Sequence, residues 1–379
     1  MSKKLKKNVI VICIDGTRID RAQKSKVIVN DLPGRIFFSN AITYAPYTNS
    51  SMYAVFSGSY GNRNGCASYW HSFKFNGTRF KTLTDYLHDD SFFTYADIHS
   101  KLSIPKQGFD NFVVYEESEN EYTSRHKDLL NKMKKLYDDG TNFFLYLHYD
   151  GIHKGIMNSV LKVYDNFSTE FFNNRSKNES RYDNLFHESE NYLQNLLDEI
   201  TFLDLWKDSI VLILSDHGCS VGEKIGERAY GSYCYDYTLR TFASFIASEF
   251  TKQEISNQIR HIDLMPTLLD YLEIPFDPNY ESIDGQSLLP LIKNQKFEEQ
   301  IAYSETANPL KENAPPKKPN TKSVRTTQWK FIFNEYNNTK ELYDLQNDPY
   351  EEKNLIGTDL EIEEILFNEL LKLQSNEIS

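Results

Sequence analysis

The chain has 379 residues, a formal net charge of −12 and a pI of about 5.3. It lacks the basic stripe of a nucleic-acid-binding protein, so we expect no nucleic-acid partner. Its four cysteines show no zinc-like or CxxC spacing and fit free thiols in a reducing compartment. No run approaches the roughly 18 apolar residues of a membrane span. The first apolar run is too short for a signal peptide, so the sequence predicts a cytoplasmic protein.

Apolar runs and helical periodicities alternate from residue 8 to about residue 295. Four runs have the length and composition of buried strands: residues 9–14, 92–97, 142–147 and 209–214. Residues 81–89 and 182–203 carry apolar side chains at helical spacing. The alternation predicts an α/β fold with a mainly parallel central sheet covered by helices on both faces.

The last part of the chain has a different pattern. Residues 308–322 are rich in Pro, Lys and Asn and are expected to form a loop. Residues 323–333 and 341–345 predict a small β unit, and residues 359–373 predict a closing amphipathic helix. We therefore expect a catalytic domain over residues 1–300 and a small α+β subdomain, residues 301–379, packed on it.

Acidic and imidazole side chains follow two of the predicted strands directly. Asp15 ends the first apolar run, and Asp216 and His217 follow residues 209–214. Open α/β sheets place their ligands at the carboxyl ends of the strands, so these side chains are expected to converge. An aspartate in this place can also form a turn or cap a helix. Two carboxylates and one imidazole suit one divalent cation: Ca²⁺, Mn²⁺ or Mg²⁺, with Zn²⁺ as a further candidate.

Segments along nearly the whole chain resemble, in order, the motifs of the sulfatases within the alkaline phosphatase superfamily. The segments that carry the resemblance include residues 15–18, 48–65, 83–110, 143–153, 215–222, 261–269, 284–290, 324–332 and 341–349. Residues 215–222 resemble the pattern Ser-Asp-His-Gly-x-x-x-Gly. The resemblance implies an alkaline-phosphatase-like sandwich and the hydrolysis of sulfuric or phosphoric esters, with Asp15, Asp216 and His217 as metal ligands.

The resemblance also implies a nucleophile. Counting back ten residues from Gly58, in the continuation of the nucleophile motif, places Thr48 at the nucleophile position, where its hydroxyl is expected to be a further ligand of the metal. The family's usual nucleophile is a Cys or Ser that becomes formylglycine, and Thr48 cannot undergo that conversion. Ser50 and Ser51 compete for this role, and a helix cap is another role for Thr48. Thr nucleophiles occur in phosphodiesterases and phosphotransferases of the superfamily.

Other site residues follow from the same comparison. His153 is the candidate general acid, because an imidazole can protonate a leaving alkoxide near neutral pH. Arg228 lies near the place of an anion-gripping lysine, and a guanidinium can clamp two oxygens of the substrate. Lys101 and His99 lie near the other substrate-binding cations of the family. For each of these side chains an ordinary surface or loop position is the alternative.

A second metal ion would need another cluster of ligands. The first ligands of such a cluster could be Asp150, His153 and His148. The only histidine beyond the Asp-His pair is His261, where the sulfatase pattern has no ligand. One ion is therefore favoured.

The sequence thus predicts a metal-dependent hydrolase that cleaves sulfate, phosphate or phosphonate esters through a covalent Thr48 intermediate. Phosphate esters are somewhat favoured, because a sulfated threonine lacks the collapse to an aldehyde by which formylglycine expels sulfate. One alternative is a phosphotransferase that moves a phospho-headgroup to a glycan or lipid acceptor. Another is a non-catalytic binding protein that keeps the fold. The expected partner is an anionic ester of a small molecule, glycan or lipid headgroup.

Overall fold

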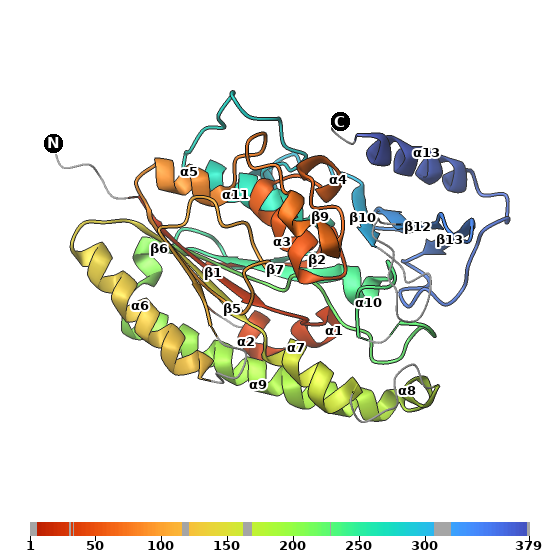
Figure 1. Ribbon diagram of the computed structural model, residues 1–379, viewed down its shortest axis with the longest axis horizontal. Coiled ribbons are helices and arrows are strands. Elements are labelled where there is room, and N and C mark those ends of the chain that lie inside the picture. The colour runs from red at the N-terminus through yellow and green to blue at the C-terminus, as the bar shows by residue number, and fades with distance from the viewer. Residues whose placement is uncertain are drawn as a thin grey trace.

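The computed structural model describes residues 6–29, 32, 34–115, 121–161, 169–227, 229–306 and 320–376. A large mixed sheet has the strand order β4-β3-β5-β1-β6-β7-β2-β8, with β9 paired to β2 (Figure 1). Its strands are β1 (Asn8–Ile14), β2 (Arg35–Ile42), β3 (Phe93–Ile98), β4 (Asn111–Val114), β5 (Phe143–Tyr149), β6 (Ser209–Leu214), β7 (Arg240–Ile246), β8 (Gln253–Ile255) and β9 (Ile259–Arg260). The four strands predicted from apolar runs correspond to β1, β3, β5 and β6.

The strands from β4 to β6 are all parallel to their neighbours, and β7 runs antiparallel to both β6 and β2. The predicted α/β fold with a mainly parallel central sheet is confirmed. The antiparallel β7 was not predicted, since a buried apolar run has the same composition in either direction.

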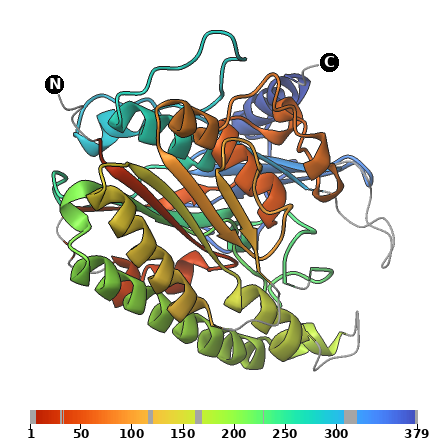
Figure 2. The ribbon, with the colours of Figure 1, turned by 60° about the vertical axis from the view of Figure 1, so that its left-hand side comes forward.

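Helices pack on both faces of this sheet. They are α1 (Ile19–Ala22), α2 (Lys26–Val29), α3 (Thr48–Ser57), α4 (Gly61–Asn64), α5 (Leu83–Asp89), α6 (Tyr122–Asp138), α7 (Gly151–Gly155), α8 (Glu170–Asn173), α9 (Arg175–Phe202), α10 (Asp236–Leu239), α11 (Leu264–Tyr271) and α12 (Leu289–Ile292). The yellow and green helices α6 and α9 lie along one face, and the orange helices α3 and α5 lie on the other (Figures 1 and 2).

The side chains of β1 contribute to the apolar cores on both faces of the sheet. Ile10, Ile12 and Ile14 belong to the apolar core under α6 and α9, whereas Val9, Val11 and Cys13 belong to the core under α3, α5 and α11. Successive side chains of a strand point to opposite faces, so a strand buried on both faces must be apolar throughout. This explains the unbroken apolar run that identified β1 in the sequence.

Helix α9 begins at Arg175, earlier than the start predicted at residue 182. Its first turns are polar, so apolar periodicity could not detect them. The fully buried Asn178 amide fixes this segment by donating to the carbonyls of Phe171 and Val221, at 2.9 and 3.1 Å. No helix of the described residues is both long enough and apolar enough to span a membrane.

The last part of the chain forms a second, antiparallel sheet. Its strands, in spatial order, are β10 (Ala302–Thr306), β11 (Thr321–Arg325), β12 (Trp329–Asn334) and β13 (Thr339–Asp344), and α13 (Glu361–Ser375) packs on it. The predicted small β unit and closing helix are present, and most of the predicted loop lies outside the described residues. The division of the chain near residue 300 stays a prediction.

Buried charges hold the small sheet against the large one. Asp236, at the start of α10, forms ion pairs with Arg325 of β11 at 2.8 Å and with Lys330 of β12 at 2.9 Å. The Lys330 side chain is fully buried and also pairs with Glu351 at 2.8 Å. A buried charge left without its partner is costly, so this network fixes how the two sheets meet.

Candidate functional site

The site lies at the carboxyl ends of four neighbouring strands, in the order β3, β5, β1 and β6. His99 follows β3, His148 lies near the end of β5, Asp15 follows β1, and Asp216 with His217 follows β6. Cys13 of β1 is in register with His148 on one side and with Leu214 on the other. Parallel pairing therefore brings side chains far apart in sequence to one edge of the sheet.

The turn after β1 is held tightly against the turn after β6. Gly16 has a φ of +75°, and a β-carbon there would lie 3.0 Å from the Cys219 sulfur, so a side chain would be strained and crowded. The Gly16 amide donates to Asp216 Oδ1 at 3.2 Å, and the Thr17 amide donates to Ser215 Oγ at 2.9 Å. These bonds fix Asp15 and Asp216 relative to each other.

Two carboxylate oxygens in this cluster lack a hydrogen-bond donor. Asp15 and Asp216 are fully buried, yet Asp15 Oδ1 and Asp216 Oδ2 have no partner among the described residues. The other oxygen of Asp216 accepts the amides of Gly16 and His217, which aims Oδ2 into the cluster. Buried carboxylates without partners are costly unless a cation neutralises them. The pattern is the one expected of metal ligands.

The orientation of His217 suits metal binding as well. Its Nδ1–H donates to the carbonyl of Gly218 at 2.8 Å, which leaves the lone pair of Nε2 directed toward the carboxylates. Nε2 lies 3.5 Å from Asp15 Oδ1 and 3.5 Å from Asp216 Oδ2. Metal-binding histidines commonly donate their other ring N–H to a carbonyl or carboxylate in this way.

Thr48 faces these ligands from the first turn of α3. Its hydroxyl donates to Asp15 Oδ2 at 3.1 Å and lies 3.5 Å from His217 Nε2. The N-cap of α3 is Tyr47, so the Thr48 side chain does not cap the helix. The competing Ser51 hydroxyl instead donates to the carbonyl of Asp216 at 2.8 Å, and the fully buried Ser50 faces the Cys66 sulfur at 3.8 Å.

These distances fit a divalent cation. His217 Nε2 lies 3.5 Å from Asp15 Oδ1 and from Asp216 Oδ2, close to the edge, about 3.4 Å, of a tetrahedron of ligands around an ion with bonds near 2.1 Å. Asp15, Asp216 and His217 each offer one ligand atom, and these three atoms lie within 4.8 Å of one another. The residues present therefore fit a metal ion, held by these three side chains next to the Thr48 hydroxyl.

Two further histidines approach the Oδ2 oxygen of Asp15. His148 Nε2 lies 3.3 Å from Asp15 Oδ2, and His153 Nδ1 lies 3.6 Å from the same oxygen. Burial alone would raise the pKa of the Asp15 carboxyl, but the charge of His153 and the hydrogen bond from His148 hold it well below its usual range. Burial alone would lower the pKa of His153, but Asp15 raises it to about 9.

Tyr230 is a site residue that the sequence did not single out. Its hydroxyl lies 3.0 and 3.1 Å from the two ring nitrogens of His153, and its ring centroid lies 4.7 Å from that of His217. Nothing in the sequence distinguishes it from the other 24 of the 25 tyrosines. Its position in the segment that follows the Asp-His pair is the only signal that could have pointed to it.

The remaining predicted residues have different surroundings. Burial and the neighbouring His148 lower the pKa of His99 to about 3, and its role in substrate binding stays a prediction. Lys101 is exposed and has no hydrogen bond or ion pair with another described residue. Arg228 lies outside the described residues. Asp150 accepts hydrogen bonds from two tyrosines, Tyr115 and Tyr122.

Comparisons with known proteins agree with this architecture. A family model described as Sulfatase matches residues 7–274, and one described as N-sulphoglucosamine sulphohydrolase, C-terminal, matches residues 234–376. Arylsulfatase K of Canis lupus familiaris is 28% identical over 166 residues, which are 40% of this chain. That alignment spans 29% of the relative's own length.

Solved structures share the fold over almost the whole chain. The phosphonate monoester hydrolase of Agrobacterium radiobacter superposes with a TM-score of 0.72 at 13% identity, over 98% of this chain and 96% of that one. A protein solved in complex with its substrate D-glucosamine-2-N,6-O-disulfate superposes with a TM-score of 0.71 at 16% identity, over 98% of both chains. At such identities the likeness shows the fold. Because the Sulfatase model matches more than half of the sequence, the chain belongs to the sulfatase family of the alkaline phosphatase superfamily, a family of ester hydrolases.

Proposed function

We propose that this protein is a metal-dependent hydrolase that transfers the acid group of an anionic ester first to Thr48 and then to water. The observation that carries the proposal is the position of the Thr48 hydroxyl. It lies 3.1 Å from Asp15 and 3.5 Å from His217, within the cluster that fits a cation. A hydroxyl is a weak nucleophile by itself and needs a neighbouring metal or base to become reactive.

When bound by Asp15, Asp216 and His217, a divalent cation would supply Lewis-acid stabilisation of negative charge on the attacking and ester oxygens. Asp15 accepts the hydrogen bond of the Thr48 hydroxyl and so orients the Thr48 oxygen. The pKa of Asp15 lies well below its usual range, so the Thr48 proton passes to solvent rather than to this carboxylate. Thr48 also begins helix α3, whose N-terminal end carries partial positive charge and favours an anionic substrate. The binding of the ester and the activation of the nucleophile thus occur at one place.

His153 is the proposed general acid. It lies on α7, directly after β5, and its side chain is 30% exposed, so it can meet both the cluster and a substrate. As the Thr48 oxygen bonds to the acid group, the bond to the alcohol breaks and His153 gives its proton to the departing oxygen. Water then attacks the Thr48 ester and His153 takes a proton from that water. As the ester bond breaks, the Thr48 oxygen takes a proton from solvent, which returns the site to its starting state.

The chemistry of threonine favours phosphate and phosphonate esters over sulfate esters. A sulfated formylglycine hydrate releases sulfate by collapsing to an aldehyde, and a sulfated threonine has no such route. A phosphothreonine can be attacked by water next to a metal ion. A glycan or other small alcohol as the rest of the ester is part of the proposal, supported by the sugar substrate of one structural relative.

The test is a set of parallel turnover assays on p-nitrophenyl sulfate, p-nitrophenyl phosphate, bis-p-nitrophenyl phosphate and p-nitrophenyl phenylphosphonate. We expect the phosphorus esters to be hydrolysed faster and Thr48→Ala to abolish turnover. Dominant sulfate hydrolysis by protein whose Thr48 is unmodified would contradict the preference for phosphorus. Product analysis with added glycerol identifies a phosphotransferase, and metal-loaded protein without turnover of any ester would contradict the proposed catalysis.

A further inference from the structure

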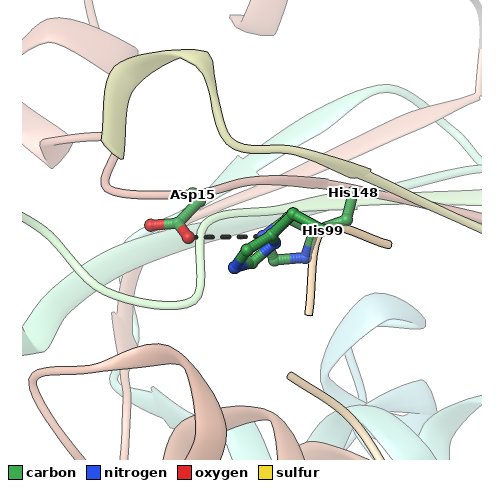
Figure 3. A group of neighbouring side chains, drawn as sticks. All are labelled: Asp15, His99 and His148. Atoms are coloured by element: carbon green, nitrogen blue, oxygen red, sulfur yellow. Dashed lines mark hydrogen bonds and ion pairs between the residues drawn. The ribbon is translucent and has the colours of Figure 1, made fainter. Parts of the chain in front are cut away.

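A second cluster of potential ligands shares Asp15 with the first. Asp15, His99 and His148 each offer a ligand atom, and these three atoms lie within 4.8 Å of one another (Figure 3). We propose that this cluster binds a second divalent cation, with the Asp15 carboxylate bridging the two ions. The proposal rests on the proposed function, because it adds an ion to the same site. The residues differ from Asp150, His148 and His153, the set that the sequence suggested.

The surroundings of His148 point to a positive ion beside it. Its Nδ1 lies 2.9 Å from the hydroxyl of Tyr146, which is itself hydrogen-bonded to the Cys13 side chain. When the Tyr146 hydroxyl donates its hydrogen bond to the Cys13 side chain, its oxygen accepts Nδ1–H of His148, and the lone pair of His148 Nε2 faces Asp15 Oδ2 at 3.3 Å. In this tautomer the lone pair and the carboxylate would repel each other unless a proton or a metal ion lay between them.

His99 supplies the observation that favours a metal ion. Its Nδ1 is buried and has no hydrogen-bond partner among the described residues, and its Nε2 has only a long contact of 3.5 Å with the Ser103 hydroxyl. Its ring centroid lies 4.6 Å from that of His148. A proton on His148 would satisfy Asp15 and leave His99 Nδ1 unpaired, whereas a metal ion would engage all three side chains.

The distances and the types of ligand agree with this assignment. The 3.3 Å between Asp15 Oδ2 and His148 Nε2 matches the edge, about 3.4 Å, of a ligand tetrahedron with bonds near 2.1 Å. Two imidazoles in the second cluster and one in the first favour Zn²⁺ or Mn²⁺ over Ca²⁺. Paired ions about 3.5–4 Å apart stabilise both the attacking and the leaving oxygen of an in-line displacement at phosphorus. The second ion therefore strengthens the preference for phosphate esters.

To test the proposal, metal-free protein is loaded with Mn²⁺ and desalted. Bound metal is then measured by metal analysis and by electron paramagnetic resonance. We expect two Mn²⁺ per chain and the broadened spectrum of a coupled pair. His99→Gln should hold one Mn²⁺ with the six-line spectrum of an isolated ion. The matched control His88→Gln, at a half-exposed histidine far from the cluster, should keep two. Parallel loading with Zn²⁺ should give the same counts.

The outcomes separate this proposal from the proposed function. One ion per chain in the wild type, unchanged in His99→Gln and lost in Asp216→Asn, would overturn the second site and leave the proposed function standing. No bound ion in the wild type, with circular dichroism showing a folded chain, would overturn both. Two coupled ions that persist in a folded His99→Gln variant would show that other residues bind the second ion and would refute the assignment to His99.

Discussion

Thr48 Oγ1 lies 3.1 Å from Asp15 Oδ2, although 33 residues separate the two in sequence. The contact joins the first turn of α3 to the carboxyl end of β1. It places a hydroxyl against a buried carboxylate whose other oxygen has no partner. The proposed chemistry depends on this relationship, because it puts a nucleophile and a metal ligand within one hydrogen bond of each other.

Substitution of Thr48 should separate catalysis from metal binding. We expect Thr48→Ala to abolish measurable turnover, a loss of kcat/KM on the order of 10⁶-fold, the scale seen when a nucleophile is removed. Bound metal and stability should stay close to the wild type, because Asp15, Asp216 and His217 remain. Thr48→Ser should recover much of the loss. The exposed Thr78→Ala is the control, and an equal effect of both alanine variants on kcat/KM would contradict the assigned role.

Removal of metal should destabilise the fold. Without a cation the buried oxygens Asp15 Oδ1 and Asp216 Oδ2 have no partner. Chelation should therefore lower Tm, and a divalent cation at 100 times its Kd should restore about 2.7 kcal/mol of unfolding free energy. Thermal denaturation with and without chelator checks this. Asp216→Asn should lose most of the response, and a Tm insensitive to metal in both proteins would contradict the site.

Tyr230 should act by positioning His153. A protonated His153 donates to the Tyr230 oxygen at 3.0 Å, so Tyr230→Phe removes an interaction that favours the charged imidazole. We expect kcat to fall by about fivefold, equivalent to about 1 kcal/mol, and the alkaline limb of the pH–rate profile to move to lower pH, with little change in KM. Tyr336→Phe, at an exposed tyrosine, is the control. A fall in kcat without a shift of the profile would indicate a purely structural role.

Glu227 should make stability depend on pH. Burial raises the pKa of its carboxyl to about 7, although Tyr237, Tyr233 and Ser232 donate hydrogen bonds to it. Since the folded-state pKa lies above the ordinary value of 4.5, this contribution to stability is complete below pH 4.5 and is lost as pH rises through about 7.

Glu227→Gln keeps the shape of the side chain without the charge. We expect it to remove about 3 kcal/mol of the pH dependence of unfolding free energy between pH 4.5 and 8, as measured by urea denaturation. Glu298→Gln, at an exposed glutamate, should leave the curve unchanged. If Glu227→Gln gave the wild-type curve, the carboxyl would not be titrating in this range.

The sequence predicted the structure correctly where a local pattern of residues specifies a secondary-structure element. The apolar runs of β1 and β6 identified buried parallel strands, because a strand covered on both faces must be apolar at every position. The acidic and imidazole residues that follow them lie together in the structure, as the rule for carboxyl strand ends implies. The polar start of α9 carried no such pattern and was missed.

The sequence by itself determined the α/β class, the family and the pairing of Asp15 with Asp216 and His217, since these follow from the order of residues along the chain. Only the tertiary structure decided that His99 and His148 lie next to Asp15 and that Tyr230 lies against His153. The physical reason is the strand order β3, β5, β1, β6. It is set by packing between layers, and it makes neighbours of strand ends that no local sequence pattern connects.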